Sequence, residues 1–136
     1  MREDIKIHQI QDVNIAVVKE WNEEKTAEVF NVYFINLKDS KVENVMVSSR
    51  GYGINLTTDE KIETSRLRHF IGDVEGKDYA KIELIMEELF SLNNEYWVSL
   101  YEGKQIQEKK FIFLAETITE ENFVDVPIIE KKGVMI

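Results

Sequence analysis

The chain has 136 residues, no cysteine and a formal net charge of -9, from 26 acidic and 17 basic residues. The lack of cysteine excludes disulfides, thiol catalysis and cysteine-ligated zinc. An acidic field repels nucleic-acid backbones and anionic membranes, so we expect no nucleic acid and no membrane among the partners.

The composition is typical of a folded globular protein, with 43% hydrophobic and 32% charged residues. The length predicts one domain, spanning residues 1–136. No apolar run approaches the ~20 residues needed to cross a bilayer. The start of the chain, MREDIKIHQI, has no apolar segment after its basic residue, so we expect no secretory signal. The lack of cysteine fits a cytoplasmic protein, so we expect a cytoplasmic location.

The first third of the chain predicts strands. Residues 5–10 and 13–21 alternate well enough for two strands or one interrupted strand, with His8 at a surface or edge position. Residues 28–37, EVFNVYFINL, are rich in β-branched and aromatic side chains, and both faces are apolar. This pattern predicts a central strand covered on both sides, or one face used in a partner contact.

Residues 42–71 predict two strands joined by a polar loop, and they hold three of the four arginines. Period-two alternation places Ser48 and Arg50 on the same face of the first strand. Arg66 and Arg68 share a face of the second strand. If the strands pair, all three guanidinium groups lie on one side of one sheet, where carboxylates or a bound anion must balance their repulsion.

These residues form the predicted anion-binding site. Arginine suits bidentate contact with a carboxylate or a phosphate, Ser48 adds a hydroxyl donor, and Tyr52 adds a stacking face between two glycines. The alternative is that the arginines pair with acidic side chains of the sheet and leave no vacant site. The predicted site residues are Ser48, Arg50, Tyr52, Arg66 and Arg68.

The second half of the chain contains an ambiguous stretch, residues 79–92, YAKIELIMEELFSL. We predict a strand at 79–85 and a short helical turn around 87–91; one helix across 79–91 is the alternative. Residues 95–116 then predict a β-hairpin with Trp97 in the core. The apolar residues 134–136 are predicted to pack on the domain or on a partner.

About eight short strands at close spacing predict an all-β fold, an antiparallel β-sandwich of immunoglobulin or fibronectin type with at most one or two short helices. An α+β fold with a helix at 79–91 is the alternative. With His8 and His69 as the two histidines, we expect no enzyme, no catalytic residues, no metal site and no cofactor. His69 is predicted to be partly buried and hydrogen-bonded.

Seven stretches spread along the chain carry a resemblance: NVYFIN, VSSRGYG, TSRLRHF, YAKIE, NNEYWVS, KKFIF and KKGV. Through them the chain resembles a group of small acidic bacterial proteins of unknown function, sometimes labelled phenylalanyl-tRNA synthetase alpha subunit. The sequence does not support that label, since it is too short for a class II catalytic domain and lacks segments resembling the ATP-binding motifs. The resemblance implies no catalytic residues.

The sequence therefore predicts a non-catalytic protein-interaction module that acts through an exposed sheet face or edge, on a protein partner or as a homodimer. The alternative function is binding of a small anion or an acidic peptide at Arg50, Arg66 and Arg68.

Overall fold

Strands make up most of the structure, a computed structural model that describes residues 8–136. Two short 3₁₀ helices accompany them, η1 (Glu87–Ser91) and η2 (Glu120–Asn122). Residues 8–136 contain no α-helix, so the alternative α+β fold with a helix at 79–91 is wrong. The strands are β1 (His8–Gln9), β2 (Val13–Trp21), β3 (Glu28–Asn36), β4 (Val42–Ile54), β5 (Lys61–Glu63), β6 (Leu67–Val74), β7 (Asp78–Ile85), β8 (Asn93–Glu102), β9 (Gln105–Phe113), β10 (Val124–Val126) and β11 (Lys131–Met135).

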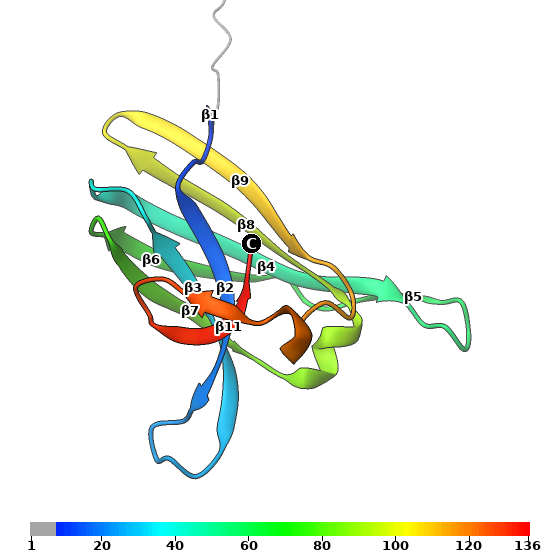
Figure 1. Cartoon of the computed structure of the whole chain (residues 1–136). Coiled ribbons are helices and arrows are strands. Elements are labelled where there is room, and N and C mark those ends of the chain that lie inside the picture. The colour runs from blue at the N-terminus through cyan, green and yellow to red at the C-terminus, as the bar shows by residue number, and fades with distance from the viewer. Residues whose placement is uncertain (1–7) are drawn as a thin grey trace, which may run out of the picture.

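The strands form two sheets (Figure 1). Sheet A has six strands in the order β1-β9-β8-β4-β5, and β6 also pairs with β4. Sheet B has five strands in the order β10-β11-β2-β3-β7. All pairs are antiparallel except β1 with β9. This all-β arrangement of two sheets is consistent with the predicted β-sandwich.

The core lies between the two sheets and follows from the alternation of their strands. On β4, Val45 and Val47 are buried while Met46 between them is exposed, as the period-two pattern predicts. On β3, Val32 and Phe34 are buried in the same cluster. Burial of such side chains is the main source of stability, at roughly 25 cal/mol per Å² of apolar surface.

Strand β3 is covered on both faces, which confirms one of the two alternatives for residues 28–37. It lies between β2 and β7 in sheet B. Its outward-facing Ile35 is buried in a second cluster with Ala16, Val18 and Val126. Ile128 and Ile129, in the turn between β10 and β11, pack against that cluster and shield it.

The ambiguous stretch resolves as predicted, into strand β7 and the short helix η1, but a β-bulge changes which side chains are buried. Val32 of β3 pairs with Glu83 whereas Tyr33 pairs with Lys81, so Ile82 is an extra residue in the ladder. Ile82 is buried and Leu84 is exposed. The bulge therefore places Glu83 on the inner side of the sheet, opposite an inward-facing valine.

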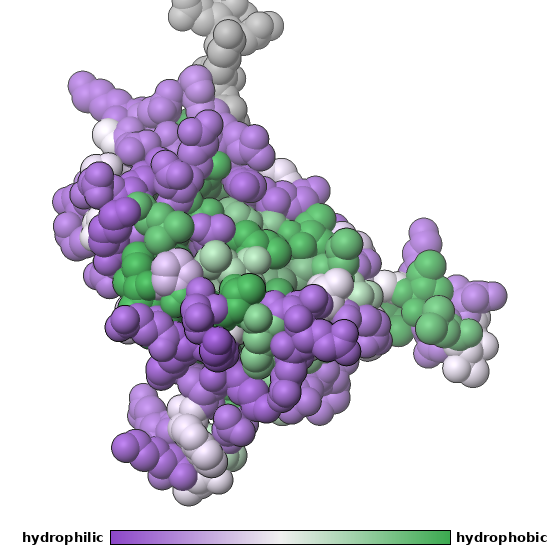
Figure 2. Space-filling model, viewed as in Figure 1, coloured by the Kyte–Doolittle hydropathy of each residue, from purple (hydrophilic) through white to green (hydrophobic). Residues whose placement is uncertain are grey.

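Two hairpins project from the two-sheet core (Figure 1). One is the β2–β3 turn. The other is the end of β4, which at 13 residues is the longest strand and continues beyond β8 with only β5 beside it. Figure 2 shows hydrophobic atoms at the tip of this β4–β5 hairpin, where Ile54, Leu56 and Ile62 are exposed.

Three further predictions can be compared with the structure. His8 lies exposed on the edge strand β1, as expected, although residues 5–7 of the predicted strand lie outside the described residues. Val134 packs into the core, so this part of the apolar stretch 134–136 packs on the domain. The core position predicted for Trp97 is wrong: its neighbour Val98 faces inward, so the indole faces outward and is 41% exposed.

No helix among residues 8–136 has the length and apolar character to span a membrane.

Candidate functional site

The three arginines of interest lie on the outer side of sheet A. Strand pairing sets Arg68 of β6 opposite Ser48 of β4, whose side chain faces outward beside Trp97 of β8. Arg66 precedes β6 and its Nη1 donates to Ser48 Oγ at 3.4 Å. Arg50 follows two positions after Ser48 on the same face of β4. We call Ser48, Arg50, Arg66 and Arg68 the arginine strip.

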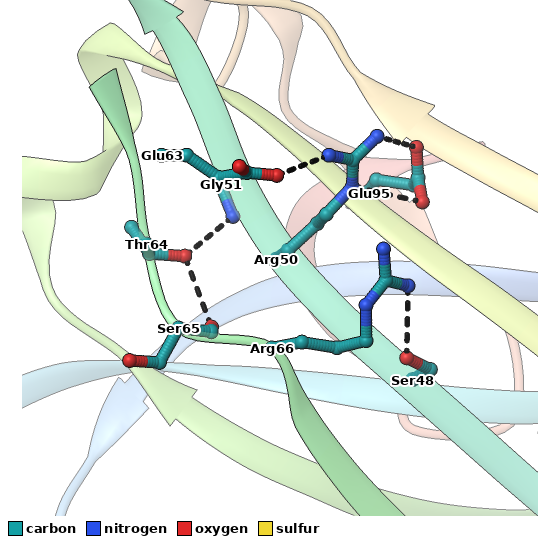
Figure 3. A network of polar contacts seen from close by, with 8 residues as sticks. All are labelled: Ser48, Arg50, Gly51, Glu63, Thr64, Ser65, Arg66 and Glu95. Carbon is teal, nitrogen blue, oxygen red and sulfur yellow. Dashed lines mark hydrogen bonds and ion pairs between the residues drawn. The ribbon is translucent and has the colours of Figure 1, made fainter.

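Arg50 is held by two carboxylates (Figure 3). Its Nη1 donates to Glu63 Oε2 at 2.5 Å, and its Nε and Nη2 donate to the two oxygens of Glu95 at 3.4 Å. Hydrogen bonds with Glu95 and Glu63 raise the pKa of the guanidinium. The Tyr52 ring lies 4.7 Å from its central carbon. Arg50 and Tyr52 thus belong to a network that links β4, β5 and β8 and in which two carboxylates engage one guanidinium group.

Arg66 and Arg68 are in a different situation. Both are exposed, and no carboxylate of residues 8–136 lies within ion-pair distance of either. Lys110 on β9 adds a third positive charge to this region, with its Nζ 5.3 Å from the Trp97 ring centre. Arg66 and Arg68 therefore present positive charge to solvent, although the protein as a whole is acidic.

The turn that carries Arg66 is fixed to β4 by hydrogen bonds (Figure 3). Thr64 Oγ1 accepts from the Gly51 N–H at 2.8 Å and donates to the Ser65 carbonyl oxygen. The Thr64 N–H donates in turn to the Gly51 carbonyl oxygen at 2.8 Å. These bonds hold Thr64, two residues before Arg66, against β4.

Large apolar side chains adjoin the arginine strip on the same outer face. Phe70 of β6 lies opposite Met46 of β4, one row from the pair formed by Arg68 and Ser48. Phe70, Met46 and Trp97 are 68%, 46% and 41% exposed. We call these three residues, with Arg66 and Arg68, the outer patch.

A second site, on the inner side of sheet A, was not predicted. Glu83 projects from the bulge of β7 and accepts three hydrogen bonds from sheet A, at 2.8 to 3.0 Å. The donors are Ser49 Oγ, His69 Nε2 and the Tyr96 hydroxyl. Burial, together with the Glu83 charge, raises the pKa of Tyr96 far above its usual value. His69 is partly buried and hydrogen-bonded, as expected.

The Glu83 side chain lines a pocket of about 270 Å³. The pocket is bounded by β4, the turn before β6, helix η1 and β8, and its walls include Leu67, Leu89 and Tyr96. The sequence offered one signal of it: Ser49 continues the inward-facing run of Val45 and Val47, and a buried polar residue there needs a hydrogen-bond partner between the sheets. Glu83 itself gave no signal, because strict alternation places it outward.

Among residues 8–136, no group of three or more His, Asp or Glu residues could hold a metal ion. Comparisons with protein-family models, with curated proteins and with solved structures found no match to this chain.

Proposed function

We propose that the protein is a non-catalytic interaction module that binds an acidic segment of a partner protein on the outer patch. The observation that carries the proposal is the grouping of three exposed apolar side chains with Arg66 and Arg68. Exposed apolar patches with polar surroundings are typical of protein interaction sites. Trp, Phe, Met and Arg are also the residues most enriched in such interfaces.

Charge complementarity supports an acidic partner. Arg66, Arg68 and Lys110 lack carboxylate partners among the described residues, so they gain ion pairs on contact with Glu or Asp side chains. A second copy of the chain fits less well, since two molecules of net charge -9 repel each other at long range. Homodimer formation is therefore an outcome of the test rather than the proposal.

Preorganisation also supports binding on this face. Met46, Phe70 and Trp97 are carried by paired strands, and hydrogen bonds fix the turn that holds Arg66. Little backbone entropy remains to be lost when a partner docks. An immunoglobulin- or fibronectin-like architecture and a cytoplasmic location remain part of the proposal. The former is supported by the two-sheet arrangement and the latter by the cysteine-free composition.

The test uses a fluorescein-labelled peptide of alternating Glu and Phe residues, compared with the same peptide carrying Lys in place of Glu. We expect saturable anisotropy changes with the acidic peptide, weakening as salt is added. Trp97→Ala and the double variant Arg66→Ala/Arg68→Ala should each lower affinity tenfold or more, at roughly 1.4 kcal/mol per tenfold. The matched control is Lys104→Ala/Lys132→Ala, which removes two exposed charges elsewhere.

Equal binding of the acidic and basic peptides, or unchanged affinity in the double arginine variant, would overturn the proposal. Sedimentation equilibrium without peptide supplies a further outcome. If the protein dimerises and Trp97→Ala abolishes the dimer, the outer patch serves a second copy and the acidic-partner proposal is wrong. If the double arginine variant unfolds, the arginines hold the sheet together, and the binding role fails.

A second candidate function is binding of a small anion by the arginine strip. The Ser48 hydroxyl lies 3.4 Å from Arg66 Nη1 and opposite Arg68, which supports a site of two guanidinium groups and one hydroxyl. Arg50 takes no part in this version, because Glu63 and Glu95 already engage it. We expect sulfate to raise the melting temperature of the wild-type protein more than that of Arg66→Ala/Arg68→Ala. An equal rise in both proteins would exclude a site at the strip.

A further inference from the structure

The pocket beside Glu83 is distinct from the outer patch, since it opens on the inner side of sheet A. Gly51 occupies an inward-facing position of β4 there, where the lack of a side chain leaves space. A Cβ at this position would lie 3.2 Å from Asn94 Oδ1 and 3.3 Å from Thr64 Cγ2. The volume of about 270 Å³ is at the small end for ligand sites, so it suits a molecule smaller than a nucleotide or a typical drug.

The hydrogen-bond donors in the deep part of this pocket are already used. Ser49, His69 and Tyr96 all donate to Glu83. The two amide hydrogens of Asn94 are directed to the carbonyl oxygens of Leu89 and Leu92, at 2.8 and 3.1 Å. An anionic ligand would therefore meet a carboxylate and find no free donor at this depth.

Acceptors, in contrast, remain available. Oε2 of Glu83 accepts only the Tyr96 hydroxyl among the described residues, while a carboxylate oxygen can accept two bonds. Asn94 Oδ1 accepts no hydrogen bond from residues 8–136, and its orientation is fixed because both amide hydrogens are bound. A ligand that enters this pocket can therefore bind by donating hydrogen bonds to these two oxygens.

The negative charge in the pocket favours a positively charged hydrogen-bond donor over a neutral one. Glu83 is a carboxylate that is mostly buried, with 16% of its side chain exposed. Arg50 also lines the pocket, but its guanidinium lies on the outer face of the sheet, where Glu63 and Glu95 engage it, so the pocket faces the negative charge of Glu83. Hydrogen bonds between an ammonium group and a carboxylate are about twice as strong as bonds between neutral groups.

We propose that this pocket binds a small primary amine, with the ammonium group at Glu83 and Asn94 and an apolar body against Leu67, Leu89 and the Tyr96 ring. Residues of both sheets line the pocket, because Glu83 comes from sheet B and Asn94 from sheet A. Binding therefore requires the sandwich to be intact and stabilises it in return.

The experiment is an NMR titration of the full-length ¹⁵N-labelled protein with phenethylamine. Two matched probes accompany it, 2-phenylethanol, which is neutral, and 3-phenylpropionate, which is an anion. We expect saturable amide shifts at Gly51 and Asn94 with the amine, affinity at least about tenfold weaker for the alcohol, and no saturable shift with the carboxylate. Equal affinity for amine and alcohol would overturn the proposal, and so would the absence of saturable shifts with the amine.

Variants of the pocket residues test whether the amine binds there. Glu83→Gln keeps the shape and removes the charge, so it should weaken phenethylamine binding about tenfold or more. Glu121→Gln, at an exposed position of η2, is the matched control and should leave affinity unchanged. If Glu83→Gln fails to fold, Leu67→Trp decides, because Leu67 is half-exposed and a larger side chain there narrows the pocket. Unchanged affinity in Leu67→Trp contradicts the proposed site.

Discussion

Glu20 on β2 is a carboxylate held in its charged form by the residues around it. It accepts hydrogen bonds from Asn31 Nδ2 and Lys131 Nζ, each at 2.7 Å, and from the Tyr33 hydroxyl. Burial opposes ionisation of this side chain. The hydrogen bonds, of which that from Lys131 is the strongest influence, outweigh burial and lower the pKa of Glu20 below 4.5.

A lowered pKa makes Glu20 a source of acid sensitivity. The unfolded chain binds this proton more readily than the folded chain, so the stabilisation is complete above pH 4.5 and is lost as pH falls through the folded-state pKa. We expect Glu20→Gln to lower the free energy of unfolding at pH 7 by about 1–3 kcal/mol. Between pH 7 and pH 3 the variant should lose less stability than the wild-type protein, as measured by urea denaturation.

The control for this prediction is Glu121→Gln, an exposed acidic residue of η2. Its stability curve should follow the wild-type curve. Parallel pH profiles for Glu20→Gln and the wild-type protein would show that Glu20 is not the group responsible.

At the residue scale, period-two alternation predicted the arginine strip but not the partners of its members. It placed Val45 and Val47 inward and Ser48 and Arg50 outward, which the structure confirms. It could not identify the carboxylates on Arg50, because Glu63 and Glu95 lie 13 and 45 residues away along the chain. Pairing between distant strands decides such contacts, and local pattern carries no information on it.

At the element scale, the β4–β5 hairpin is ordered although its apolar tip is exposed. The Asn55 side chain accepts from the N–H groups of Thr57 and Thr58, and backbone bonds join Asn55 to Asp59 and Glu60. Leu56 in this loop is 94% exposed. The hairpin thus presents an apolar side chain on a defined loop without burying it.

Leu56→Ser should leave the free energy of unfolding within about 0.5 kcal/mol of the wild-type value, because the side chain buries no surface in the fold. Val47→Ser, at a buried core position, is the contrasting variant and should be strongly destabilising. Chemical denaturation measures both. A clear loss of stability in Leu56→Ser would mean that the tip packs on the rest of the domain in solution.

Close approach between β11 and β2 gives a second prediction at this scale. A Cβ on Gly133 would lie 2.2 Å from the carbonyl oxygen of Val17. Gly133→Ala should therefore displace β11 from β2 and cost about 2 kcal/mol or more. Lys132→Ala, at an exposed neighbouring position, should have little effect. Hydrogen exchange should show faster exchange at Val17 in Gly133→Ala, and equal protection would contradict the prediction.

Element positions were predictable where the pattern was long and periodic. The strand at 79–85 and the turn at 87–91 match β7 and η1 closely. The bulge at Ile82 was not predictable, since it arises from pairing with β3 and reverses the alternation after it. Strand β5 was missed because its three residues, KIE, give too short a pattern. Trp97 was misplaced because its size suggested burial, whereas alternation with Val98 sets its direction.

At the scale of the whole molecule, the order of strands in each sheet could not be predicted from the sequence. Sheet B joins strands from both parts of the chain: β11 pairs with β2, and Asn14 Nδ2 donates to an oxygen of Ile136, 122 residues away. Sheet A likewise sets β4 between β6 and β8. Such topology depends on how two apolar faces fit together, and many strand orders satisfy the same alternation.

The late pairing of β11 with β2 has a consequence for the protein while the ribosome is still making it. Strand β2 emerges early, and its VNIAVVKEW sequence is the kind of segment that recruits other nascent or misfolded chains through an open edge. Its neighbour on that side is not synthesised until residue 131 and beyond. This edge of β2 therefore stays unpaired during translation until β11 has been synthesised and closes it.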